Sequence, residues 1–424
     1  MIEWSETDEL VRGAIREFVD KEVRPHVDEL EHGDLPPYDL IRKLFASFGI
    51  DAMASESLKK LLDKQRAREA ATAAGEEPPA KDSKSAGGGF GFGGGGGQET
   101  MGLILASELA GVSLGMIAAI GVSLGLGAST IMARGTLAQK ERWLPELVTF
   151  EKVAAWALTE PDSGSDAFGG MRTTVRRDGD GYVLNGQKTF ITNGPYADTT
   201  VVYAKLDEGD GTPIRDRAVL LFVLDKGMEG FTQSKPMRKM GMHSSPTGEL
   251  FFDNVKLGRD RLLGESEQHA AGDGRESARE GFVVERVGVA ALSLGIINEC
   301  LRLCTAYAKT RKLWDKPIAD FQLIQLKLAK MELARINVQN MLFQTVAKAR
   351  EGKRPSLAEA SAIKWYSSEA ATEVAMEAVQ LFGGNGYMSE YRVEQLARDA
   401  KSLMIYAGSN EVQITQVARG LLEA

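Results

Sequence analysis

Two short polar stretches of the chain carry residue types that suit a large, planar, anionic cofactor. The first, at 156–166, reads WALTEPDSGSD, and the second, at 185–194, reads NGQKTFITNG. Backbone N–H groups hold phosphate oxygens, glycine allows a close approach of the chain, and an aromatic side chain covers a flat ring. Each stretch alone is equally typical of a polar β-turn, so the interpretation depends on finding both in one chain.

A single carboxylate, Glu285, lies in a helical stretch on an otherwise apolar stripe. The stripe continues at Val289, Leu292 and Ile296, which are four, seven and eleven residues further on. Burying a carboxylate there costs free energy unless it has a task or a partner, and burial raises its pKa towards neutrality. Two interpretations stay open, a general base and a structural ion pair with a nearby Lys or Arg.

The elements that must position these residues follow from the hydrophobic periodicity. Helical periodicity runs over 3–30, 40–48, 55–74 and about 100–150, and an alternating pattern begins at 153. The expected strands are 152–158, 171–177, 182–184, 188–192, 199–205, 218–224 and 249–255, with a hairpin turn at 178–181. Long helices are expected at 281–312, 318–350, 356–382 and 391–404, and from about 410, where Ser409 or Asn410 provides the cap.

This order predicts an α+β fold with three domains. We expect an N-terminal helical domain at 1–152 with an insertion at 52–98, a central antiparallel β-barrel (or sandwich) domain at 153–262, and a C-terminal domain resembling a four-helix bundle at 263–424. Within the insertion, the glycine-rich run at 87–97 predicts a flexible loop. An ordered lid anchored by Phe90 and Phe92 is the alternative.

Composition excludes some classes of function. The chain has 424 residues and a net charge of −8, so no global basic field draws it to nucleic acid. The uncharged segment 109–133 is long enough to span a bilayer, but its glycines and the absence of aromatic or basic flanks favour buried, closely packed helices. The two cysteines are expected to be buried free thiols, and the four histidines lack metal-ligand spacing, so we expect no metal. The N-terminus lacks the features of a signal peptide, and we expect a cytoplasmic protein.

Six motifs, in this order along the chain, resemble those of the acyl-CoA dehydrogenase family. They are LTEPDSGSD at 158–166, NGQKTFITNG at 185–194, RKLWDK at 311–316, FGGNGY at 382–387, RDAK at 398–401 and IYAGSNE at 405–411. The similarity covers nearly the whole chain apart from 52–98 and part of 265–280. It implies an FAD enzyme that oxidises the α,β C–C bond of an acyl-CoA thioester to a trans-2-enoyl-CoA. It also implies an electron-transfer flavoprotein as the electron acceptor and a homotetramer.

The resemblance assigns further roles by matching position. The implied FAD-binding residues are Trp156, Leu158, Thr159, Gly164, Ser165, Phe190, Ile191, Thr192, Arg311, Trp314, Gln322, Gln380, Gly384, Ser409 and Glu411. Those from Arg311 to Gly384 should reach the FAD of a neighbouring subunit. Thr192 should reach flavin N5, and Phe190 stands where the family often has Trp. Acyl-CoA contacts are implied for Ser165, Arg286 and Gly408.

The catalytic base requires a choice between two positions. Many family members carry a Glu at the place of Ala407, which cannot accept a proton. The helix around Glu285 resembles the one that carries the base in isovaleryl-CoA and long-chain acyl-CoA dehydrogenases, which also have a small residue at the Ala407 position. The resemblance therefore implies Glu285 as the base and the Ala407 backbone N–H as a donor to the thioester carbonyl. An oxidase or monooxygenase on the same fold, or a catalytically silent flavoprotein scaffold, is the alternative. The small residues at 111–129 leave room for a branched or bulky acyl group.

Overall fold

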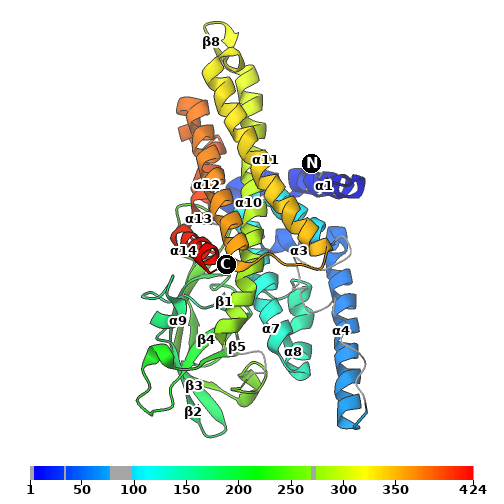
Figure 1. Cartoon of the computed structure of the whole chain (residues 1–424), viewed down its shortest axis with the longest axis vertical. Coiled ribbons are helices and arrows are strands. Elements are labelled where there is room, and N and C mark those ends of the chain that lie inside the picture. Colours follow the sequence, from blue (N-terminus) through cyan, green and yellow to red (C-terminus); the bar gives the residue numbers. More distant parts are fainter. Residues whose placement is uncertain (1–3, 33–34, 77–97, 269–273, 424) are drawn as a thin grey trace.

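The computed structural model describes residues 4–32, 35–76, 98–268 and 274–423. Figure 1 shows a curled sheet with the N-terminal helices beside it and a long helical bundle that extends away from it. The glycine-rich run at 87–97, with the two proposed lid anchors Phe90 and Phe92, lies outside the described residues.

The N-terminal part is helical, as predicted, but the single helix expected at 3–30 is broken. Pro25 lacks a backbone N–H, so the regular helix cannot continue through it. The chain instead forms α1 (Glu6–Phe18), a π-helix η1 (Val19–Val23), a 3₁₀ turn η2 (Arg24–His26) and α2 (Val27–Glu31). The elements that follow are α3 (Tyr38–Phe48), α4 (Ile50–Ala73), α5 (Gln98–Ala110), α6 (Leu114–Ile120), π-helix η3 (Gly121–Ala128), α7 (Ser129–Arg134) and α8 (Leu137–Val148).

The helix predicted in the first half of the insertion is confirmed as α4. It packs along α8 through Leu58 and Leu62, which are buried. At its polar edge, Arg66 pairs with Glu141 of α8 at 2.5 Å. Because its remaining face is polar and exposed, α4 forms an outer layer over α8.

Close helix packing is also confirmed for the glycine-containing segment. A Cβ added at Gly111 would lie 2.9 Å from the carbonyl oxygen of Gly295, so this segment touches the backbone of α10 (Gly274–Thr310). Likewise, a Cβ at Gly127 would lie 2.6 Å from that of Ala154, which places η3 directly on the sheet. Two helical stretches, Leu114–Arg134 and Gly281–Thr310, are long and apolar enough to cross a membrane, but 56% and 67% of their most apolar windows are buried within the fold.

The central sheet is mixed and open, so the prediction of an antiparallel barrel is wrong. Its strands are β1 (Ala154–Ala157), β2 (Thr174–Asp178), β3 (Gly181–Thr192), β4 (Thr199–Leu206), β5 (Val219–Asp225), β6 (Phe231–Gln233) and β7 (Thr247–Leu257), and α9 (Ala167–Gly170) follows β1. β4 pairs in parallel with β1 and β2 and antiparallel with β5. From β2 the sheet continues through β3 and β7 to β6. Among the described strands, β5 and β6 remain edges that do not pair with each other. The sheet therefore curls into a half-barrel.

Two further strand predictions change in the structure. The strands expected at 182–184 and 188–192 form one strand, β3, which bends at two register shifts against β7. β4 is buried at every position because one face packs in the sheet's own core and the other lies under the helices. The hairpin at 178–181 is confirmed by the pairing of Asp178 with Gly181.

The C-terminal part forms the predicted helical bundle. Its long members are α10 (Gly274–Thr310), α11 (Gln322–Arg350) and α12 (Leu357–Phe382), followed by α13 (Val393–Leu403) and α14 (Asn410–Leu422). A small hairpin, β8 (Lys312–Leu313) and β9 (Lys316–Pro317), joins α10 to α11 at the end of the bundle that is remote from the sheet (Figure 1). Cys300 and Cys304 are buried free thiols on α10, as predicted.

Candidate active site

The structure brings the two polar stretches of the β-domain side by side. Lys188 of β3 donates from Nζ to the carbonyl oxygen of Leu158 at 3.0 Å. One residue on, the Thr189 N–H donates to the carbonyl oxygen of Thr159 at 2.9 Å. The segment after β1 and the end of β3 therefore form one continuous surface.

A buried ion pair fixes this surface from below. Lys188 Nζ lies 2.8 Å from Glu160 Oε1, with the two side chains 0% and 5% exposed. Glu160 also accepts backbone N–H groups of Arg172 at 2.6 Å and Thr173 at 3.0 Å. Burial raises the pKa of Glu160, but the Lys188 ammonium and these hydrogen bonds outweigh it and hold the pKa below its ordinary value. Burial lowers the pKa of Lys188 to about 8 against the opposing pull of Glu160.

The surface above this pair has features that fit a flavin. Phe190 is 64% exposed and adopts a left-handed φ of 57°, a conformation that is costly for a bulky residue and is concentrated at functional sites. Thr159 and Thr192 are half-buried beside it, and Gly164 and Ser165 are exposed. The Trp156 Nε1 is buried and has no described hydrogen-bond partner. An uncovered ring, hydroxyls and an unpaired donor suit a planar polar ligand.

Ile191 differs from its neighbours in this motif. Its side chain is 3% exposed and packs in the core of the sheet. Only its backbone is available for the predicted contact with FAD.

The second part of the candidate site is the face of α10 that carries Glu285. Glu285, Gly288 and Leu292 are half-buried on one face, whereas Val289 and Ile296 are buried. Burial raises the pKa of Glu285 to about 7, and the Arg286 and Lys364 cations limit the rise. The carboxyl group therefore titrates near neutrality, as a general base requires.

Opposite α10 lies the 406–409 loop between α13 and α14. Ala407 and Gly408 have left-handed φ values of 57° and 81°. Their carbonyl oxygens accept hydrogen bonds from Gln413 Nε2 at 3.2 and 2.8 Å, and Gly408 O also accepts one from Lys364 Nζ at 2.8 Å. No described backbone acceptor takes the N–H groups of Ala407 and Gly408. The loop is thus held through its carbonyls and leaves two donors free.

α10 and this loop are neighbours in space. A Cβ added at Gly408 would lie 3.7 Å from Arg286 Nη2, and Tyr406 and Ala407 pack in the same apolar cluster as α10. Arg286 itself is 4% exposed and donates to Ser361 Oγ at 2.9 Å. Its contact with CoA stays a prediction.

The other predicted FAD-binding residues lie apart from this site within one chain. Arg311 and Trp314 are exposed at the β8–β9 hairpin, and Trp314 is 82% exposed. Gln322, Gln380 and Gly384 are also exposed on the bundle. At the near end, Ser409 is the N-cap of α14, although its side chain makes no capping hydrogen bond, and Glu411 is exposed.

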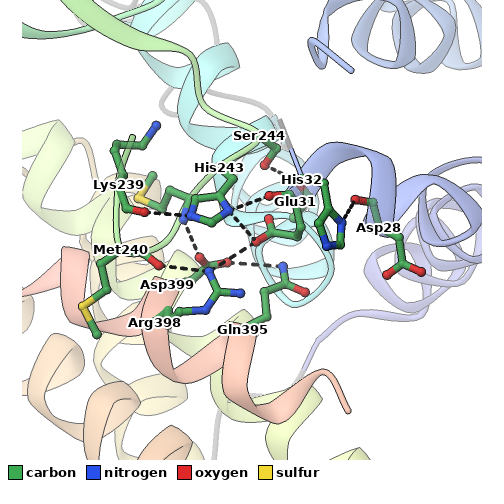
Figure 2. Close-up of polar contacts among 12 residues, drawn as sticks. Asp28, Glu31, His32, Lys239, Met240, His243, Ser244, Gln395, Arg398 and Asp399 are labelled. Carbon is green, nitrogen blue, oxygen red and sulfur yellow. Dashed lines mark hydrogen bonds and ion pairs between the residues drawn. The ribbon is translucent and has the colours of Figure 1, made fainter. Parts of the chain in front are cut away.

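A buried charged cluster lies where α2, the segment before β7 and α13 meet (Figure 2). His243 places Nδ1 2.5 Å from the carbonyl oxygen of Glu31 and Nε2 2.8 Å from that of Lys239. The Glu31 carboxylate lies 3.6 Å from Arg398. Burial and the Asp399 carboxylate raise the pKa of Glu31 to about 8, and Arg398 opposes the rise. Because α13 leads directly into the 406–409 loop, this cluster ties the loop to all three parts of the fold.

Sequence reasoning missed several residues beneath the site, chiefly Lys364 and Gln413. Lys364 is 0% exposed on α12 among Ala360, Ile363 and Ala371, which are buried. A lysine on an apolar helical stripe is the same signal that singled out Glu285, so the pattern held the information.

A solvent-open cavity of about 430 Å³ lies elsewhere, at the 178–181 hairpin. Arg177, Tyr182, Arg259 and Glu267 are among its lining residues, and Arg177 and Glu267 form an ion pair at 2.5 Å. It shares no residue with the surfaces around Phe190 and Glu285.

Comparison with known proteins identifies the family. The N-terminal, middle and C-terminal domain models of acyl-CoA dehydrogenase match residues 89–151, 155–255 and 272–422. The chain is 34% identical to a 3-(aryl)acrylate reductase from Clostridium sporogenes over 99% of its own length and 100% of the relative's. It is 39% identical to a short-chain acyl-CoA dehydrogenase from Megasphaera elsdenii over 76% of the chain and 82% of the relative. The butyryl-CoA dehydrogenase structure from the same organism aligns over the full length of both chains with a TM-score of 0.78 and 32% identity. The protein described here belongs to the acyl-CoA dehydrogenase family of FAD-dependent oxidoreductases.

Proposed function

We propose that this enzyme dehydrogenates the α,β C–C bond of an acyl-CoA thioester with Glu285 as the base. The observation that carries the proposal is the placement of Glu285 on α10 beside a loop that has Ala407 in place of an acid. A half-buried carboxylate with a pKa of about 7 is poised to accept a proton at neutral pH. The free N–H of Ala407 supplies the donor that an acyl thioester oxygen needs.

In this mechanism the chain supplies orientation and proton transfer. The thioester carbonyl accepts a hydrogen bond from the Ala407 N–H, which acidifies the α-carbon. Glu285 then takes the α-proton, so that the C–H bond breaks and a carboxylic O–H forms. Thr159, Phe190 and Thr192 would hold FAD, whose chemistry would be to accept the hydride of the β-carbon as the C=C bond forms. Proton abstraction by a positioned base contributes about 10²–10⁴-fold to such rates.

The residues proposed to hold FAD come from two surfaces. Leu158, Thr159, Phe190 and Thr192 form the platform above the Glu160–Lys188 pair, and Ser165 follows on the adjoining turn. The exposed set at the far end of the bundle, which includes Trp314, serves a neighbouring subunit in this proposal. Exposed apolar side chains on α11 support such an assembly, since Leu323, Leu326 and Leu333 are 76%, 53% and 58% exposed. We therefore propose a homotetramer.

We infer that the acyl group is branched or otherwise bulky. A Cβ added at Gly288, one turn from Glu285, meets no atom within 4 Å, and the same holds for Gly121 and Gly125 of η3. Open space at Gly288 leaves room for a wide acyl group beside Glu285. Relatives of the chain include isovaleryl-CoA and 2-methylacyl-CoA dehydrogenases from plants, at 34–35% identity over 76% of the chain.

Electrons leave through a partner protein in this proposal. A relative that is 38% identical over 70% of the chain is a subunit of the caffeyl-CoA reductase–Etf complex of Acetobacterium woodii. We propose an electron-transfer flavoprotein as the acceptor here too. An oxidase on the same fold would instead consume oxygen during turnover, which an oxygen electrode detects directly.

The test is an anaerobic titration of the holoenzyme with straight, branched and aryl acyl-CoAs, with flavin absorbance as the readout. Wild type should bleach, and Glu285→Gln should bleach about 10²–10⁴ times more slowly with its FAD retained. Glu146→Gln on α8 is the matched control and should behave as wild type. Bleaching at the wild-type rate in the Glu285 variant would remove this residue from the mechanism.

A further inference from the structure

Lys364 is a buried cation whose contacts lie in the 406–409 loop and the start of α14. Its side chain is 0% exposed in the middle of α12. Nζ donates to the carbonyl oxygen of Gly408 at 2.8 Å and to Asn410 Oδ1 at 2.9 Å. No described carboxylate forms an ion pair with it. Burying an ammonium with only neutral partners is expensive, so its position calls for an explanation beyond packing.

The loop that Lys364 holds has a conformation that needs support. Two successive residues, Ala407 and Gly408, are left-handed, and left-handed backbone is costly for Ala. Lys364 and Gln413 together satisfy the carbonyl groups of both residues. A charged donor makes a stronger hydrogen bond than a neutral one, so Lys364 is the firmer of the two anchors.

Lys364 also acts on Glu285 through charge. The charge of Lys364 limits the rise in the pKa of Glu285 that burial causes. In turn, burial lowers the pKa of Lys364 to about 8, and the charge of Glu285 opposes this fall. The other groups that face this pair are Arg286 on α10, the buried Tyr406 phenol from the loop, and Glu411 from α14. Both Arg286 and Lys364 lie near the loop, and among the described contacts Lys364 is the one of these two cations that donates a hydrogen bond to its backbone.

We propose that Lys364 is a positioning residue for the dehydrogenation, which fixes the loop whose N–H groups face the thioester and supplies a positive charge that favours the ionised form of Glu285. The inference rests on the proposed role of Glu285. Through this one ammonium, the position of the backbone donor in the loop and the charge of the base on α10 depend on the same side chain.

The test separates the anchor from the charge. The readout is exchange of the substrate's α-protons for deuterium in D₂O, followed by mass spectrometry of the acyl-CoA across pH, with holoenzyme and no electron acceptor. Lys364→Met removes both contributions. Its exchange should be slower at the plateau, and the acidic limb of the pH profile should move to higher pH by on the order of one unit, because Glu285 loses a neighbouring cation.

Two further variants divide the effect. Gln413→Leu weakens the anchor without a change of charge, so it should lower the plateau and leave the limb in place. Asn410→Asp keeps the lysine but adds a carboxylate at its hydrogen-bond distance, so it should move the limb upward even if Lys364→Met fails to fold. Lys140→Met removes another buried lysine, which donates to Gln65 at 2.8 Å far from the loop, and should leave the profile unchanged.

The outcomes distinguish the two proposals. If Glu285→Gln exchanges the α-protons as fast as wild type, the proposed base is wrong. If exchange depends on Glu285 but the limb stays at the wild-type pH in both Lys364→Met and Asn410→Asp, the role of Lys364 is overturned. A limb that moves in both variants and not in Gln413→Leu supports it.

Discussion

Replacing Lys188 by Met should destabilise the platform beneath the proposed flavin surface. The ammonium lies 2.8 Å from Glu160, and both side chains are essentially excluded from water. Met has a similar length and no charge, so the variant removes the cation with little change in volume. What remains is a carboxylate that keeps two backbone donors but has lost its counter-charge.

The magnitude follows from this geometry. Removing one partner of a buried ion pair costs about 3–5 kcal/mol, and the Leu158 carbonyl also loses a donor worth about 1 kcal/mol. We expect the free energy of unfolding to fall by about 4–6 kcal/mol. The double variant Glu160→Gln/Lys188→Met carries no buried charge and should recover part of the loss, because the amide can accept only one of the Arg172 and Thr173 N–H groups. Lys256→Met, which breaks a solvent-exposed pair with Asp178, should cost less than about 1 kcal/mol.

Urea unfolding of the holoenzymes measures these differences, and the ratio of flavin to protein absorbance reports FAD retention. The Lys188 variant should unfold at lower urea and lose FAD on gel filtration, while Lys256→Met keeps it. The reasoning is refuted if Lys188→Met is as stable as Lys256→Met, or if the double variant is no more stable than the single one.

Three other predictions follow from individual contacts. The pKa of Glu31 is raised from its ordinary 4.5 to about 8, so the folded state binds this proton more tightly and loses stability as the pH rises between those values. The Tm of Glu31→Gln minus that of wild type should therefore be larger at pH 8.5 than at pH 5. An equal Tm difference at the two pH values would contradict this. Gly295→Ala should lower the free energy of unfolding in urea by about 1–3 kcal/mol because its Cβ meets the Ser107 carbonyl, whereas Gly121→Ala, which meets nothing, should be close to neutral. With a pKa of about 7 at Glu285, stopped-flow bleaching should rise about tenfold per pH unit below neutrality and approach a plateau near pH 8, and a flat profile over this range would exclude this base.

The helices and most strands could be predicted because each buries one face, and burial leaves a period in the sequence. The same logic located Glu285, since a carboxylate breaks the apolar stripe of its helix. Local capping could be predicted in part: Ser409 is the N-cap of α14, as expected, but its side chain makes no capping hydrogen bond.

Sheet closure and strand pairing could not be predicted because they depend on partners far apart in the chain. An alternating pattern fits a closed barrel and an open half-barrel equally well, since both have one inner face. The strand β6 has only three residues, and its pairing of Phe231 with Phe252 becomes visible only once the two rings stack 5.4 Å apart. The parallel pairing of β1 with β4 likewise leaves no local signature.

The buried polar residues of the site were missed for a different reason. Lys364 acts on a carbonyl group 44 residues further along the chain, and Gln413 acts on carbonyl groups of the loop just before its own helix. A carbonyl has no residue type to recognise in a sequence. A loop that carried a catalytic carboxylate could be recognised from that side chain in the sequence. Ala407 contributes only its backbone N–H, so the loop acts through its conformation, and neighbouring residues fix that conformation.

The base and the backbone donor of the proposed site are therefore held in position in two different ways. A base on α10 is held by the helix itself, because its backbone hydrogen bonds run through every turn around Glu285. The donor in the 406–409 loop has no such regular support and adopts left-handed angles that Ala disfavours. Its precision must come from buried side chains behind it, and Lys364 and Gln413 occupy that place. When the acid lies on the helix and not in the loop, the loop must therefore be held rigid by residues that do not contact the substrate. Substitutions at those two positions should consequently impair proton abstraction as strongly as many substitutions within contact of the acyl group.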